Sequence, residues 1–383
     1  MKKVLIFTTA YKPYVGGAEI AVAEITKRLG ADHIFFMITY RFSRALPAFE
    51  NRDGMEIYRL GFGTVLDRWF LFPILAFFKA LRIHRRQKVD LLWAVMVTYA
   101  SIGAYFTKMI HPELPLLLTL QEGDPIEHLK FGKMGMLGLW WKLLLRRADY
   151  VQAISSYLAD FAVLRGAKSK VAIVPNGVNI EHFSKAPKNE VLQRLRDSFR
   201  LRPEDKVAVT VSRLVKKNAV DVCIKSLAHL DGRFKLLIVG TGQDLGELQK
   251  LVSALKLSER VIFTGQVSHV ELPDYLHLAS VFIRPSRSEG LGNSFLEAMA
   301  ANVPIIGTLE GGVKDFLKDG ETGLACKVDD PQDLAEKIRQ LAEDQVLREA
   351  VSFKAAESIR HAYSWDSVTG GMKNIINELV KNS

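Results

Sequence analysis

Residues 284–307 read RPSRSEGLGNSFLEAMAANVPIIG, and this stretch decides how the second half of the chain folds. The apolar run before it predicts a strand, a glycine-rich loop follows, and good helix formers then predict a helix capped by Asn293 or Ser294. A junction of this kind binds anions, because the first backbone N–H groups of a helix have no partner within it. Glu289 in the loop and Glu297 in the helix place a carboxylate on either side of the junction.

These two carboxylates allow three interpretations. A carboxylate that faces vicinal hydroxyls accepts two hydrogen bonds, as recognition of a ribose requires. A glycosidase instead needs two acids on opposite sides of a glycosidic bond, and nothing in the sequence places a second acid in that way. The third interpretation makes Glu297 a plain surface residue of the helix.

The same strand–loop–helix pattern extends through the whole chain, and it is typical of parallel sheets covered by helices on both faces. Strands are predicted at 4–8, 33–39, 91–95, 116–120, 150–153, 170–174, 206–211, 234–239, 260–263, 281–285 and 304–307. Helices are predicted at 17–30, 98–110, 155–166, 220–229, 244–255, 294–301 and 331–343.

The pattern stops near residue 175, which predicts two α/β domains. PNGVN at 175–179 and the polar stretch that runs to Lys206 are interpreted as a linker. A chain of 383 residues is too long for one core, so we expect an N-terminal domain at 1–185 and a C-terminal domain at 186–364. Ligands of open α/β sheets bind at the carboxyl ends of strands, so a cleft between the domains is the expected site. The amphipathic segment after Trp365 could pack on either domain.

The net charge of +10 lies entirely in the first half. Residues 1–190 hold 26 Lys and Arg against 16 Asp and Glu, whereas residues 191–383 hold 26 of each. A basic half suits anionic lipid, nucleic acid or a phosphorylated acceptor. Nucleic acid is a poor partner here, because no recognised binding motif accompanies the charge.

Two segments of the basic half combine aromatic and aliphatic residues with a cationic end, namely 69–88 and 137–147. Basic amphipathic helices of this kind lie on membrane surfaces, and a core-facing helix with a basic edge is the alternative. The apolar run at 69–78 is too short to span a bilayer, and the start of the chain does not resemble a secretory signal. With only two cysteines, Cys223 and Cys326, we expect a cytoplasmic protein, with peripheral contact to the inner face of the membrane as an option.

Two further segments carry candidate phosphate-binding groups. YKPYVGGAE at 11–19 places Gly16 and Gly17 at the start of a helix, where backbone N–H groups can approach an anion; a plain tight turn is the alternative. SRLVKKN at 212–218 places Arg213 and two lysines just past a strand, where they suit a diphosphate, although solvated surface cations would look the same. The glycines of GTGQDLG at 240–246 are a near miss to a dinucleotide fingerprint and are a weak signal alone.

Together these segments resemble the retaining glycosyltransferase family 4, whose members have the GT-B fold of two facing Rossmann-like domains. Glu289 and Glu297 match the E-x7-E motif of that family, and the resemblance runs along nearly the whole chain. It implies transfer of a hexose from a nucleoside diphosphate sugar to a glycan or lipid-linked acceptor, without a cofactor or an obligatory metal. The matching stretches are YKPYVGGAE, VPNGVN, SRLVKKNAVD, IVGTGQ, VIFTGQV and the segment at 284–307.

The resemblance also implies a role for each candidate residue. Gly16 and Gly17 would face the donor diphosphate, and Arg213 with a lysine would neutralise it as it leaves. Glu289 would contact hydroxyls of the donor sugar, and Glu297 would hold the ribose. The helix at 365–383 would cross back onto the N-terminal domain. The remaining donor-binding positions are Gly240, Val267 beside the base, and the backbone at Leu291, Gly292, Asn293 and Ser294.

The sequence departs from the family pattern at two positions. The phosphate lysine commonly stands five residues after the arginine, where this chain has Asn218, so we expect Lys217 rather than Lys216 to take the role. A histidine common after an N-domain strand is replaced by Gln121, which can position a substrate but cannot titrate. Glu122 and Asp124 nearby resemble a metal-binding pair only superficially.

Two other functions remain as alternatives at this point. A sugar-nucleotide epimerase of the same fold would need an acid or base at the donor sugar, which Gln121 does not supply. A catalytically degenerate partner subunit would account for Asn218 and Gln121 but not for the intact Arg213, Glu289 and Glu297.

Overall fold

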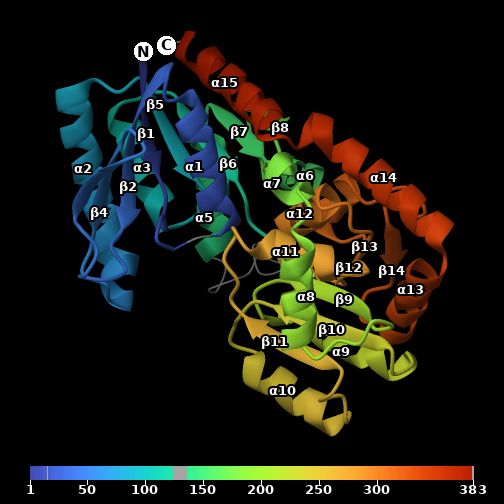
Figure 1. Ribbon diagram of the computed structural model, residues 1–383. Helices are drawn as coiled ribbons and strands as arrows, with labels where there is room; N and C mark the ends of the chain where they lie inside the picture. The colour runs from blue at the N-terminus through green and yellow to red at the C-terminus, as the bar shows by residue number, and fades with distance from the viewer. Residues whose placement is uncertain (15, 124–135, 382–383) are drawn as a thin grey trace. The chain divides into compact units, whose positions relative to one another are not determined.

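The computed structural model describes residues 1–14, 16–123 and 136–381 (Figure 1). The chain divides into two compact units, Met1–Gly177 with Trp365–Ser383, and Val178–Ser364. Each unit is a parallel sheet with helices, so the predicted pair of Rossmann-like domains is confirmed. Among the described residues, none of the helices has the length and apolar character that crossing a bilayer requires.

The described part of the first unit contains an eight-stranded sheet in the order β3-β4-β2-β1-β5-β6-β7-β8. Its pairs are parallel except that of β3 with β4. The inner strands are buried on both faces, which explains their continuous apolar sequences. The strands are β1 (Lys2–Phe7), β2 (His33–Tyr40), β3 (Phe49–Arg52), β4 (Met55–Leu60), β5 (Leu91–Val95), β6 (Leu116–Leu120), β7 (Tyr150–Ala153) and β8 (Lys170–Ile173).

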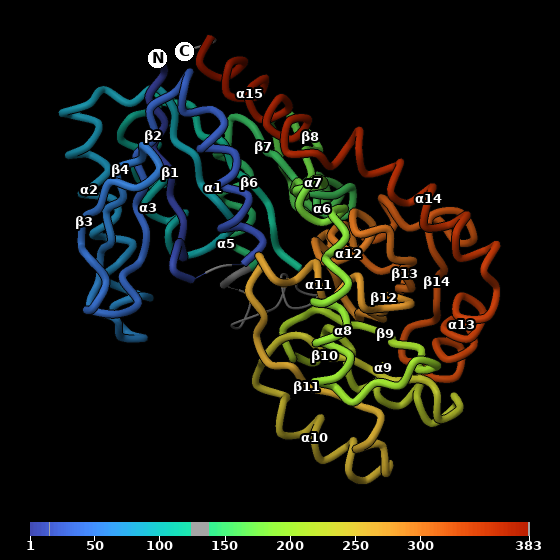
Figure 2. Tube along the Cα trace, viewed as in Figure 1, coloured from blue at the N-terminus to red at the C-terminus, as the bar shows by residue number. Residues whose placement is uncertain are grey.

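The C-terminal segment folds onto this first unit as helix α15 (Trp365–Lys381), which packs beside α1 (Figure 2). Trp365 anchors it, because a Cβ at Gly177 would lie only 2.5 Å from the Trp365 ring. The apolar side of α15 joins the core formed by β1, β2 and β5. The other helices of the unit are α1 (Gly17–Leu29), η1 (Asp67–Leu71), α2 (Phe72–Gln87), α3 (Tyr99–Ile110), α5 (Met136–Arg147) and α6 (Ser156–Leu164).

The second unit contains a six-stranded parallel sheet in the order β11-β10-β9-β12-β13-β14. Both cysteines lie in its core, where burial raises the pKa of Cys326 to about 12. The strands are β9 (Lys206–Val211), β10 (Phe234–Val239), β11 (Val261–Gly265), β12 (Val281–Arg284), β13 (Ile305–Thr308) and β14 (Leu324–Cys326). The helices are α7 (Ile180–Ser184), α8 (Asn189–Ser198), η2 (Lys216–Asn218), α9 (Val220–Ser226), η3 (Leu227–His229), α10 (Leu245–Ala254), α11 (Leu272–Leu278), α12 (Asn293–Ala300), η4 (Gly311–Asp315), α13 (Pro331–Glu343) and α14 (Gln345–Ala362).

The chain passes from the first unit to the second at Gly177, within the segment interpreted as a linker, but the polar stretch that follows is structured, so that part of the prediction is wrong. It forms α7 and α8, and α8 packs against α11 with the rings of Phe199 and Tyr275 6.1 Å apart. The first unit already ends at Gly177, because the Val178 N–H donates to the Tyr363 carbonyl within the second unit. The charged residues that suggested a linker are the solvent-facing side of a short amphipathic helix.

We expect Trp365→Ala to lower the free energy of unfolding of the first unit by about 3–5 kcal/mol, because it leaves a large cavity between α15 and Gly177. Urea denaturation followed by circular dichroism measures the change. Phe353→Ala in α14 is the control, since Phe353 is 69% exposed and its loss should cost no more than about 0.5 kcal/mol. Equal effects of the two substitutions would contradict the assigned anchor.

Candidate functional site

The loops that follow β9 and β10 run against each other at the carboxyl end of the second sheet. The Ser212 N–H donates to the Val239 carbonyl at 3.0 Å, and the Leu214 N–H donates to the Thr241 carbonyl at 2.9 Å. Gly240 has φ of +133°, and a Cβ there would lie 2.0 Å from the Ser212 carbonyl oxygen, so only glycine allows this approach. Because Leu214 is fully buried, its neighbour Arg213 is turned to solvent.

The guanidinium of Arg284, at the end of β12, is the centre of the site. Nη2 donates to the Glu289 carboxylate at 2.7 Å and to the Asn218 side-chain oxygen at 3.2 Å. Nη1 donates to the Ser294 hydroxyl at 2.7 Å, and Nε donates to the Ser286 hydroxyl at 3.2 Å. The side chains of Arg284 and Glu289 are each only 11% exposed. One buried cation therefore joins the loop after β9, the loop after β12 and the start of α12.

Asn218 extends this network back to Arg213. It is buried, and its side-chain N–H donates to the Arg213 carbonyl at 2.7 Å. The position where the family carries a lysine is thus taken by an amide that bridges Arg213 and Arg284. The sequence analysis missed Arg284, although a charged residue that closes the buried strand VFIR is a visible signal.

The two neighbouring lysines differ in exposure. Lys217 is half-buried and Lys216 is exposed. Their carbonyls accept from Arg287, whose backbone N–H lies 2.7 Å from the oxygen of Lys217. The Arg287 guanidinium in turn pairs with Asp221 at 3.0 Å and Asp329 at 2.7 Å. Arg287 therefore fixes the backbone of η2, and Lys217 lies on the more enclosed side of η2.

Glu289 is held through its backbone as well as its carboxylate. The Gly312 N–H donates to the Glu289 carbonyl at 3.1 Å. Gly311 has φ of +61°, and a Cβ there would lie 1.8 Å from the same carbonyl oxygen. The Ser286 hydroxyl adds a contact of 3.3 Å to the carboxylate. Glu289 is thus a rigid, paired carboxylate.

Helix α12 begins without the predicted cap, so that expectation is wrong. Its N-cap is Gly292, which has φ of +94° and no side-chain hydrogen bond to the helix. Ser294 lies within the helix and accepts from Arg284 instead. Phe295 fixes the start of the helix on an aromatic cluster, with its ring 5.1 Å from Phe282. The N-terminal end of the α12 dipole, which carries partial positive charge, therefore lies beside the Glu289 side chain.

Glu297 lies one turn further along α12 and is 13% exposed. Its Oε1 is 3.2 Å from Nε2 of His269, which lies in the loop after β11, two residues beyond the half-buried Val267. His182 binds the His269 carbonyl at 3.0 Å. Neither histidine was predicted, because no motif marks them. The structure nevertheless connects the predicted ribose-binding and base-binding positions through His269.

The predicted residues of the first unit lie at two strand ends. Gly16 and Gly17 are exposed at the start of α1. The half-buried Gln121 follows β6, and its side-chain oxygen accepts from Asn176 at 3.1 Å. Glu122 is buried, and its carboxylate accepts the backbone N–H of Val97 at 2.6 Å, so it has a structural role. Asp124 lies outside the described residues.

A group with ligand atoms close enough to hold a metal ion occurs elsewhere in the first unit, at the ends of α2 and α3. His84, His111 and Glu113 bring one ligand atom each within 4.8 Å of the others. Burial lowers the pKa of His84, which favours the neutral imidazole that binds metals. The three residues share no member with the predicted site.

Comparisons with known proteins agree with this architecture. The model described as Glycosyltransferase Family 4 matches residues 15–182, and that described as Glycosyl transferases group 1 matches residues 193–358. The chain therefore belongs to the family 4, group 1 glycosyltransferases and is an enzyme of that class, which confirms the resemblance predicted from its motifs.

Individual relatives are distant in sequence. The chain is 25% identical to N-acetyl-alpha-D-glucosaminyl L-malate synthase of Bacillus anthracis, over 99% of this chain and 98% of that protein. It is 34% identical to the GDP-mannose-dependent alpha-(1-6)-phosphatidylinositol monomannoside mannosyltransferase of Mycolicibacterium smegmatis, over 51% of this chain and 54% of that protein. The crystal structure of Anabaena HepE in complex with UDP and glucose superposes with a TM-score of 0.81 at 18% identity, covering 99% and 100% of the two chains. This last likeness supports the GT-B fold.

We expect Arg284→Met to lower the free energy of unfolding of the second unit by about 3–5 kcal/mol, because Glu289 is left buried without its cation. Arg213→Met removes the same charge from an exposed position and should change it by no more than about 0.5 kcal/mol. Urea titration of both variants measures the difference. Adding Glu289→Gln to the Arg284→Met variant should recover part of the loss, and equal stability of the two single variants would refute the network.

Proposed function

We propose that the enzyme transfers a hexose from a nucleoside diphosphate sugar to a glycan or lipid-linked acceptor, with retention of the anomeric configuration. The observation that carries the proposal is the Arg284 network, which fixes Glu289 and the start of α12 beside a loop that carries exposed cations. Two relatives support a donor of this kind, since one is named as GDP-mannose-dependent and another was solved with UDP and glucose.

Departure of the diphosphate is the step that needs charge stabilisation, because two phosphate groups accumulate negative charge as the bond to the sugar breaks. Arg213 is exposed at the carboxyl end of β9, and Lys217 lies on the enclosed side of the same loop. The start of α12, from Leu291 to Ser294, adds partial positive charge. We propose that these groups stabilise the leaving diphosphate without an obligatory metal.

In this proposal the two carboxylates bind different parts of the donor. Glu289, oriented by Arg284, accepts hydrogen bonds from hydroxyls of the transferred sugar. Glu297 accepts two hydrogen bonds from the ribose, and the contact of its carboxylate with the 44% exposed His269 gives way to the ribose hydroxyls. Val267 lies beside the base, and Gly240 gives the diphosphate close access to the backbone.

The first unit contributes backbone and a neutral side chain. Gly16 and Gly17 offer exposed N–H groups to the diphosphate. Gln121, held by Asn176, positions a sugar hydroxyl and does not exchange protons. As the bond from the anomeric carbon to the diphosphate breaks, a bond to the acceptor oxygen forms on the same face. The acceptor proton can then pass to the departing phosphate oxygen.

We expect Arg213→Ala to lower kcat by at least about 100-fold, the usual loss when one group that stabilises a transition state is removed. Glu297→Ala removes two hydrogen bonds to the ribose and should lower kcat/KM for the donor by at least about 100-fold. Transfer of labelled sugar from a panel of nucleoside diphosphate sugars into a membrane extract measures turnover. Lys217→Ala should lose more activity than Lys216→Ala. NMR of the anomeric proton in donor and product tests retention.

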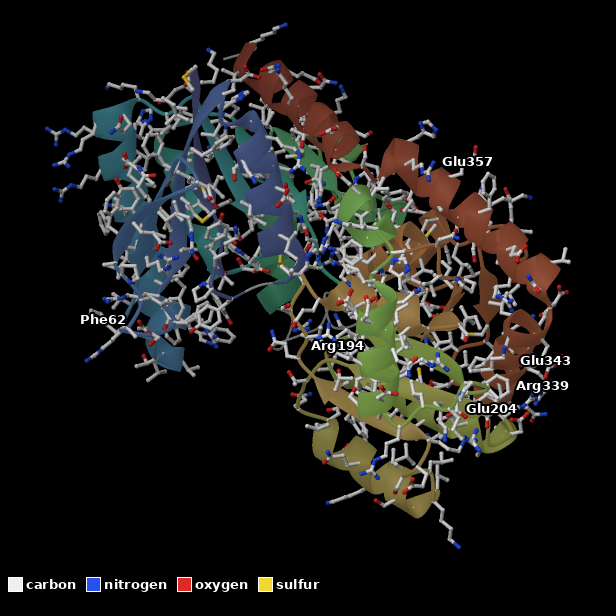
Figure 3. All side chains as sticks on the ribbon, in the orientation of Figure 1. Phe62, Arg194, Glu204, Arg339, Glu343 and Glu357 are labelled. Carbon is white, nitrogen blue, oxygen red and sulfur yellow. The ribbon has the colours of Figure 1, made fainter. Side chains whose placement is uncertain are left out.

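The controls remove the same side chains from exposed helix positions of α14. Arg360→Ala and Glu357→Ala should keep wild-type turnover (Figure 3 labels Glu357). Circular dichroism melting shows whether each variant is folded. Unchanged turnover in both site variants would overturn the site, and epimerised donor without transfer would favour an epimerase.

A further inference from the structure

Helix α2 and the turn of π-helix that precedes it carry a continuous apolar row on their outer face. Leu66, Phe70, Ile74 and Phe78 are 73%, 69%, 53% and 61% exposed. Residues four apart lie on the same side of a helix, so these side chains form one row. A solvent-facing row of large apolar residues is uncommon on a helix that already has a buried side.

The loop before this row is held rigidly and adds to it. Phe62 and Val65 are also more than half exposed, and Figure 3 shows Phe62 at the edge of the first unit. Burial raises the pKa of Asp67, but hydrogen bonds from the Tyr40 hydroxyl, the Phe62 N–H and Thr64 outweigh it and lower the pKa to about 2. Asp67 is therefore ionised at physiological pH and fixes the loop that presents Phe62.

Towards the end of α2, the exposed side chains on the same side of the helix are cationic. Arg82 and Arg86 follow Phe78 at the same spacing of four, and Arg85 and Lys88 are exposed beside them. Three of these arginines line a surface hollow together with Leu81. Between residues 62 and 88 the only acidic residue is Asp67, which is buried. The segment is thus apolar at one end and cationic at the other.

The end of α3 widens the apolar part. Phe106, Met109 and Ile110 are 44%, 50% and 60% exposed. The Phe106 ring lies 6.3 Å from that of Phe77, which neighbours Phe78, so the two helices present adjacent apolar groups. The term α2 face denotes this surface, which consists of Phe62, Val65, Leu66, Phe70, Ile74, Phe78, Arg82, Arg86 and the three residues of α3.

The second basic segment of the sequence has a different role. Trp141, Leu144 and Leu145 of α5 are buried, and the Trp141 ring packs at 5.0 Å against Phe161. For this segment the core-facing interpretation is therefore the correct one. Among the described residues of the two segments, the larger row of exposed apolar residues followed by exposed arginines lies on α2, although both segments have the same kind of composition.

We propose that the α2 face binds the surface of an anionic lipid bilayer. The apolar row would enter the interface between headgroups and acyl chains, and the arginines would bind lipid phosphates. The charge pattern favours this occupant, because phosphates complement a cluster of arginines that has no acid on its own helix, whereas a protein partner generally presents both charges; Glu56 and Glu113 on neighbouring elements lie near Lys79 and His84 of α2. The proposal does not depend on the donor chemistry, and binding is measured without turnover.

The test is sedimentation of the full chain with vesicles of phosphatidylcholine alone or mixed with equal phosphatidylglycerol. We expect binding to the mixed vesicles that weakens as salt rises, and little binding to the neutral ones. The double variant Arg82→Glu, Arg86→Glu should partition at least about 30-fold more weakly, the loss expected for two cations near the surface. The double variant Phe70→Ser, Phe78→Ser should also lose binding.

Matched controls come from exposed positions of the second unit. Arg194→Glu with Arg360→Glu reverses two arginines outside the α2 face, and Phe353→Ser removes an exposed phenylalanine (Figure 3 labels Arg194). Both should sediment like the wild type, and melting curves confirm that every variant is folded. Equal sedimentation of all variants, or a wild-type dimer in solution that Phe70→Ser, Phe78→Ser abolishes in the absence of vesicle binding, would overturn the proposal.

Discussion

The second unit depends on a single buried cation at the end of a strand. Arg284 donates to side chains of the loop after β12, of the start of α12 and of Asn218, which lies 66 residues earlier in the chain, and the carbonyl of Val211 lies 3.4 Å from its Nη1. A buried guanidinium is tolerated only when its charge is paired and its N–H groups have acceptors. Asn218, Glu289 and Ser294 must therefore adopt these positions together, and the site is organised before any ligand arrives.

Because of this constraint, the charged residues that stabilise the structure of the site differ from those that are available to bind a ligand. Arg284 and Glu289 lie inside, whereas Arg213 is exposed and Glu297 has only a partly exposed histidine as its described partner. Preorganised groups stabilise developing charge without having to reorganise during the reaction. Asn218 fits this division: in place of a lysine that would need its own counter-ion, it is a neutral bridge between the interior cation and the Arg213 loop.

Sequence patterns predicted the parts of the fold in which burial dictates composition. β5, β6, β9 and β10 have the predicted bounds, because each is a continuous apolar run between polar turns. The patterns failed where polarity has another cause, as in α8, whose charged side suggested a linker. Asn218 and Arg284 are 66 residues apart, and no spacing rule predicts their contact. Nor does composition distinguish α2, whose apolar row faces outward, from α5, whose Trp141 is buried.

The central claim is that the second unit binds a nucleoside diphosphate through the start of α12 and Glu297. Thermal denaturation with UDP, GDP or ADP tests it most directly, because a ligand at 100 times its dissociation constant stabilises a fold by about 2.7 kcal/mol. The account predicts that one of the three raises the melting temperature of the wild type and fails to raise that of Glu297→Ala. A wild type that responds to none of them, or a Glu297→Ala variant that responds equally, would contradict it.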